Sequence, residues 1–143
     1  MSTAFFTHAD CRRHDMGAGH PECPQRLDAI EDHLIATGLD IALTRHDAPL
    51  VDLKDVELAH THHYVAELRD LLQQIEASGE PKALDPDTAA NPGTWKAALR
   101  AAGDRISFDP RGGNQLRFWR GADELHLPLL AILLRIRQPC SHQ

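Results

Sequence analysis

The side chains best suited to chemistry gather near the start of the chain, between residues 8 and 27. The potential metal ligands and proton carriers there are His8, Cys11, His14, His20 and Cys23, set among glycines and prolines. Imidazole nitrogens and thiolates are common ligands of Zn²⁺ in proteins. Their spacing here forms no compact Cys-x-x-Cys or His-x-x-x-His pair. We therefore expect polar loop contacts and small buried thiols instead of a metal site.

Two further clusters carry ionisable groups, and neither has the setting that catalysis needs. His60, His62 and His63 are nearly adjacent. Neighbouring helical residues point in different directions, so at most two of them could share a metal. Asp85 and Asp87 flank a proline, a pattern that favours turn hydrogen bonds over acid–base chemistry. The chain also lacks a Gly-x-Ser-x-Gly nucleophile turn and a phosphate-binding glycine loop.

These groups need a scaffold, and the apolar periodicity predicts one of mixed strands and helices. We expect strands over residues 3–7 and 40–44, helices over 26–38, 65–77, 95–102 and 127–137, and turns over 84–88 and 91–93. Gly38 is placed to stop the first helix, and Asp52 and Thr94 are placed to cap later ones. The pattern becomes irregular after Gly103.

The composition fits one soluble globular domain. The chain has 143 residues, of which 42% are hydrophobic and 25% charged, and its formal net charge is −6. That charge argues against a nucleic-acid or anionic-membrane partner. Three cysteines form no disulfide framework and the first residues form no secretory signal, so we expect a cytoplasmic location. The apolar run over 127–134 is much shorter than the roughly 20 residues of a membrane span.

Charge divides the chain into two parts near Gly103. Residues 1–103 hold 9 Lys+Arg and 17 Asp+Glu, whereas residues 104–143 hold 6 Arg, no Lys and 4 acidic residues. We therefore expect a structured part over 1–103 and a divergent tail over 104–143. The Arg-only composition of that tail is typical of a frameshifted or partly disordered end.

Several motifs in this order resemble one enzyme family. They are Thr7-His8, His14-Asp15-Met16-Gly17, His20-Pro21-Glu22 followed by Pro24 and Arg26-Leu27, Leu58-Ala59-His60, Tyr64-Val65, Asp85-Pro86-Asp87-Thr88 and the Ala-rich segment from Trp95 to Gly103. Residues 4–103 resemble the N-terminal third of the histone deacetylase and acetylpolyamine amidohydrolase superfamily, its bacterial members most of all. The His-Pro-Glu-x-Pro-x-Arg-Leu core is the most specific of these motifs.

The resemblance implies a fold, a reaction and a set of binding residues. The fold is α/β, the N-terminal portion of a three-layer, arginase-like domain with a mainly parallel sheet flanked by helices. The reaction is hydrolysis of an acetyl-amide, in acetyl-lysine or an acetylpolyamine, by a zinc-bound water. Asp15, His20 and Pro21 would border the substrate entrance, Arg26 would line an inner channel near the acetate product, and Asp87 would lie on a second rim loop.

The sequence departs from the family where its chemistry resides. The Arg-Pro-Pro-Gly-His-His segment, the later Asp and His zinc ligands and the catalytic Tyr are all missing, so we assign no catalytic or metal-ligating residue. We expect a truncated chain that is inactive alone and does not bind zinc stably. The alternatives are a non-catalytic interaction or regulatory fragment that associates with a full-length deacetylase and, more weakly, a small metal-binding protein. We also expect the apolar faces of residues 65–77 and 95–102 to be exposed, which would cause self-association.

Overall fold

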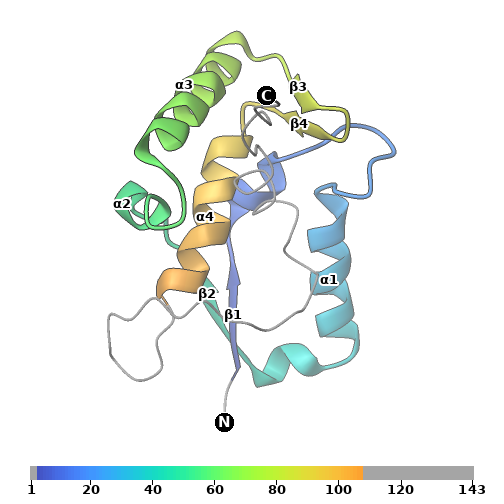
Figure 1. Ribbon diagram of the computed structural model, residues 1–143. Helices are drawn as coiled ribbons and strands as arrows, with labels where there is room; N and C mark the ends of the chain where they lie inside the picture. Colours follow the sequence, from blue (N-terminus) through green and yellow to red (C-terminus); the bar gives the residue numbers. More distant parts are fainter. Residues whose placement is uncertain (1–2, 108–143) are drawn as a thin grey trace, which may run out of the picture.

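The computed structural model describes residues 3–107, with side chains to Gly103, and has the expected α/β character (Figure 1). The elements in chain order are β1 (Thr3–Thr7), η1 (Ala9–Arg13), α1 (Gln25–Ala36), η2 (Leu39–Ala42), β2 (Leu43–Asp47), α2 (Leu53–Val56), α3 (His62–Ser78), β3 (Lys82–Asp85), β4 (Thr88–Ala90) and α4 (Thr94–Ser107). The helix expected over 127–137 and almost all of the expected tail lie outside the described residues. No helix among residues 3–107 is long and apolar enough to span a membrane.

The parallel sheet is built from the first two strands. β1 pairs with β2 in parallel, from Thr3 opposite Leu43 to Thr7 opposite Asp47. Parallel strands need a long crossover, which η1, α1 and η2 supply. The strand expected over 40–44 begins only at Leu43, because the preceding residues 39–42 form a 3₁₀ turn. Gly38 stops α1 as expected and adopts a left-handed conformation with φ of 72°.

The core lies where α3 packs on α4. The predicted apolar face of α3 is buried throughout, and its members are Val65, Leu68, Leu72 and Ile75. Leu68 and Leu72 belong to one buried cluster with Ala98 of α4, and Val65 belongs to a second with Leu99. The expectation that these two faces would be exposed is therefore wrong, because the two helices pack their apolar faces against each other. The large apolar residues that are exposed are Ile35, Leu39, Ile41, Leu50 and Leu58.

A short antiparallel hairpin, β3–β4, precedes α4, and the sequence pattern did not predict its strands. The residues between the strands, Pro86 and Asp87, form the turn that was expected. Each strand has four residues or fewer, too few to show a clear alternation. Thr88 and Ala90 nevertheless point into the protein and are buried.

α4 continues past the predicted end at Ala102 and reaches Ser107. Gly103 therefore lies inside the helix instead of ending it. A Cβ atom at this position would collide with the carbonyl oxygen of Pro49 and would lie 2.8 Å from its carbonyl carbon. The Val51 N–H also donates to the Leu99 carbonyl at 3.1 Å. Gly103 thus permits the segment around Pro49 to approach the helix backbone.

Arg100 joins α4 to two other segments. Its Nε donates to Asp10 Oδ2 at 3.2 Å, and its Nη1 donates to the Ala48 carbonyl at 2.7 Å. We expect Arg100→Leu to lower the free energy of unfolding by about 1.5–3 kcal/mol, because the hydrogen bonds are charged and partly buried. Urea unfolding measures the change. Lys54→Ala, which breaks an exposed pair with Asp52, is the control and should change little. Equal losses of stability in the two variants would contradict a stabilising role for the Arg100 hydrogen bonds.

Candidate functional site

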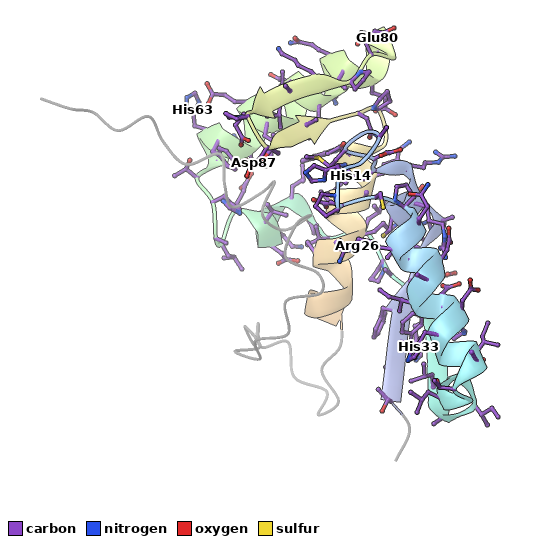
Figure 2. The ribbon with its side chains drawn as sticks, turned by 90° about the vertical axis from the view of Figure 1, so that its right-hand side faces the viewer. His14, Arg26, His33, His63, Glu80 and Asp87 are labelled. Atoms are coloured by element: carbon purple, nitrogen blue, oxygen red, sulfur yellow. The ribbon has the colours of Figure 1, made fainter. Side chains whose placement is uncertain are left out.

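The loop of residues 14–24, the opening loop, lies against the hairpin and the start of α4 (Figure 2). The backbone N–H of Ala89 in β4 donates to Met16 Sδ at 3.3 Å. The side-chain amide of Asn91 donates to the Asp15 carbonyl at 3.3 Å. These contacts join residues more than seventy positions apart in the sequence. They place the first half of the opening loop alongside β4.

His14 joins the opening loop to the start of α4. Its side chain is buried, and its Nδ1 lies 2.9 Å from the hydroxyl of Thr94 in the first turn of α4. Thr94 was expected to precede this helix as its N-terminal cap. The structure instead makes Thr94 the first helical residue and directs its hydroxyl to His14 and Asn91.

Asn91 makes the turn that leads into α4, in the segment 91–93 where the sequence predicts one. Its Oδ1 accepts hydrogen bonds from the Gly93 N–H at 3.1 Å and the Thr94 hydroxyl at 3.0 Å. Its own N–H donates to Thr94 Oγ1 at 2.8 Å. Asn followed by Pro-Gly and Thr is a typical side-chain-stabilised turn, so the signal was present in the sequence.

The buried centre of the site is the pair His14 and Glu22. His14 Nε2 lies 3.5 Å from Glu22 Oε1 and has no hydrogen-bond partner among the described residues. Burial lowers the pKa of His14, which nearby Asp15 raises and His20 lowers. Burial likewise raises the pKa of Glu22, against the lowering effect of Arg26 and His20. The surroundings therefore favour the neutral form of both groups.

The structure places three of the sequence-predicted binding residues in the opening loop itself. Asp15 is exposed, and its Oδ1 accepts from the Gly17 N–H at 2.8 Å, where Gly17 has a φ of 99°. His20 is half-buried and accepts from the Glu22 N–H at 3.0 Å through Nδ1. Pro21 is exposed next to it.

Arg26 and Asp87 complete that set from other elements. Arg26 is half-buried in the first turn of α1, close enough to lower the pKa of Glu22. Asp87 is exposed in the hairpin turn, and its backbone N–H donates to Asp85 Oδ1 at 3.0 Å. This hydrogen bond lowers the pKa of the Asp85 carboxyl. Asp15 thus lies in the opening loop, and Asp87 lies in the hairpin that this loop contacts through Met16 and Ala89.

Zinc, which the resemblance implies, does not fit the side chains of this part of the chain. Among residues 3–107 no group of three or more His, Cys, Asp or Glu side chains could hold a metal ion. His8 Nδ1 instead accepts from the Asp10 N–H at 3.0 Å. His62 pairs with Glu57 at 2.8 Å. The side chains of residues 3–103 therefore supply no ligand set for zinc.

Comparisons with known proteins point to one family. The sequence model of the histone deacetylase domain matches residues 20–108. A solved structure, the HDA15 HD domain, has a similar fold with a TM-score of 0.61 and 24% sequence identity. The superposition covers 74% of this chain and 30% of that one, so this chain spans less than a third of that domain. No curated protein matches the sequence.

Proposed function

This chain belongs to the histone deacetylase family, and we propose that it forms the substrate entrance of a zinc-dependent acetyl-amide hydrolase. The observation that carries the proposal is the contact between the opening loop and β4, through Met16 and Ala89. That contact brings together the two segments that would border the entrance. The described residues then have binding and orienting roles, and no step of the hydrolysis is assigned to them.

The charge of the entrance indicates the class of substrate. Asp15 and Asp87 present exposed carboxylates, and residues 1–103 carry an excess of acidic side chains. A negative rim attracts cationic ligands and raises their local concentration. An acetylpolyamine and an acetyl-lysine in a basic peptide both carry positive charge beside the acetyl-amide. Arg26 lies deeper and has the charge to bind the acetate product.

A chimeric enzyme tests the proposal directly. Residues 1–103 would replace the matching N-terminal part of the HDA15 HD domain, and hydrolysis of an acetyl-lysine peptide and an acetylated polyamine would be measured. We expect the chimera to show turnover. Asp15→Ala and Asp87→Ala should each weaken it mainly by raising KM about tenfold, because each variant loses one charged contact. Glu67→Ala, an exposed change on α3, is the control. A folded, zinc-loaded chimera without turnover would contradict the proposal.

The 143-residue chain alone should show neither turnover nor stoichiometric zinc after purification. This expectation rests on the missing His-His, zinc-ligand and Tyr motifs in the sequence. Metal analysis and a deacetylation assay measure both quantities. Stoichiometric zinc that disappears in a His14→Ala, His20→Ala double variant would favour a small metal-binding protein instead.

A second candidate function is that of a non-catalytic fragment that associates with a full-length deacetylase or with itself. The observation that favours it is the exposure of Ile35, Leu39 and Ile41 at the junction of α1 and η2, with Ile41 92% exposed. Such apolar residues often mark a protein contact. Sedimentation of the chain, alone and mixed with a purified deacetylase, measures the association. Ile41→Ser should weaken it, whereas a purely monomeric chain in both samples would count against this candidate.

A further inference from the structure

The Thr94 hydroxyl decides which nitrogen of His14 carries a proton. A hydroxyl group donates one hydrogen bond and accepts two. Thr94 Oγ1 donates to Asn91 Oδ1 at 3.0 Å and accepts from the Asn91 N–H at 2.8 Å. Thr94 Oγ1 lies 2.9 Å from His14 Nδ1 and has one lone pair left to accept from it. Nδ1 is therefore the donor, and Nε2 of a neutral His14 is an acceptor.

That acceptor nitrogen is buried and faces a carboxyl group. His14 Nε2 has no hydrogen-bond partner among the described residues, and Glu22 Oε1 lies 3.5 Å away. The side chains of His14 and Glu22 are only 2% and 14% exposed. If Glu22 were ionised, the lone pairs of its carboxylate would face the lone pair of Nε2, and the two groups would repel each other. A protonated carboxyl group would instead donate to Nε2 after a small approach.

We infer that His14 and Glu22 are positioning residues that close the opening loop through one proton, carried by the Glu22 carboxyl and donated to His14 Nε2. The pair joins the first residue of the loop to a residue near its end, so its hydrogen bond closes the loop around Asp15 and Gly17. The inference rests on the proposed function, since Asp15 is the residue that the closed loop would present at the entrance.

The surrounding charges fix the sign of the pH dependence. Asp15 and His20 face His14, while Arg26 and His20 face Glu22. The pKa of Glu22 is raised above its ordinary 4.5 by burial, so closure is strongest at acid pH and weakens as pH rises through the folded value. The pKa of His14 is lowered from 6.5 by burial. A proton on His14 Nε2 would turn that nitrogen from an acceptor into a donor, so a hydrogen bond donated by Glu22 requires a neutral His14.

The protonation state of His14 can be measured on the unaltered full chain. Long-range ¹H–¹⁵N correlation spectra distinguish protonated from unprotonated imidazole nitrogens. We expect a neutral His14 with the proton on Nδ1 on the acid side of the Glu22 titration. His46, whose exposed ring lies against Phe6, is read in the same spectra for comparison. A neutral His14 with its proton on Nε2 at every pH would overturn the inference.

Glu22→Gln separates the shared proton from a merely structural role. The Gln amide has a similar shape and is a permanent donor, so it replaces the protonated carboxyl group. The readout is the hydrogen-exchange protection of the Ala89 amide, which donates to Met16 in the opening loop. In the unaltered chain, this protection should fall as the pH rises and Glu22 ionises. The fall should be about tenfold for each unit by which loop closure raises the pKa of Glu22.

The variant should keep its protection across the same pH range, and Glu67→Gln, an exposed change, should retain the original pH dependence. A Glu22→Gln chain that loses protection with pH as the unaltered chain does would overturn the inference. Neither readout uses hydrolysis. Failure of the chimeric enzyme together with the expected His14 protonation state would therefore count against the proposed function alone.

Discussion

Leu72→Ala is expected to lower the free energy of unfolding by about 2–5 kcal/mol. Leu72 is 2% exposed and lies at the centre of the buried cluster between α3 and α4. Truncation removes its buried surface and leaves a cavity that the flanking helices fill only in part. Because a domain of this size has a total stability of about 5–15 kcal/mol, the loss should be visible as a large shift of the urea midpoint.

Leu58→Ala is the matched control for this experiment. It deletes the same atoms from a side chain that is 64% exposed, so the free energy of unfolding should change by less than about 0.5 kcal/mol. Equal effects at the two positions would show that α3 and α4 do not form the core. They would also restore the expectation of an exposed apolar face on α3.

Gly103→Ala is expected to destabilise the protein, although alanine is the better helix former. Helix propensity alone favours Ala over Gly by about 1 kcal/mol. The added Cβ, however, would occupy the place of the Pro49 carbonyl oxygen, and it would lie 3.0 Å from the Val51 nitrogen. These are backbone atoms, which cannot rotate away as a side chain can. We therefore expect a net loss of about 1–3 kcal/mol in the free energy of unfolding.

Thermal and urea unfolding of Gly103→Ala would be compared with Lys96→Ala, an exposed change in the same helix. The control should be nearly neutral. A more stable Gly103→Ala chain would mean that propensity decides the outcome and that Pro49 does not contact α4. Gly93 should behave similarly to Gly103, because a Cβ there would meet the backbone of Arg13. Gly103 inside α4 and Gly93 just before it thus mark two places where another segment of the chain approaches closely.

Much of the helical structure could be predicted from the sequence because its signals are local. The apolar spacing of α3 and the Asp52 cap of α2, whose carboxylate accepts from the Lys54 N–H, need only neighbouring residues. Gly79 ends α3 in a left-handed conformation, as a glycine after a helix commonly does. The motif around Arg26 was specific enough to indicate the family, which the match to the deacetylase domain confirms.

The hairpin and the bounds of two elements could not be predicted in the same way. β3 and β4 are stabilised by pairing with each other, and short strands have little intrinsic preference for that state. Residues 40–42 were expected to begin a strand, but after Gly38 residues 39–42 form a 3₁₀ turn. α4 passes Gly103 because contact with Pro49 makes a glycine necessary inside the helix.

The candidate site shows the same division between local and tertiary information. The sequence by itself determined which residues are available, including Asp15 and Arg26, and where several of the turns and helix ends lie. Only the tertiary structure decided that His14 meets Thr94 across 80 positions and that its Nε2 faces Glu22 in a buried place. The physical reason is that such contacts depend on which segments fold together. Neither residue type nor local spacing specifies that pairing.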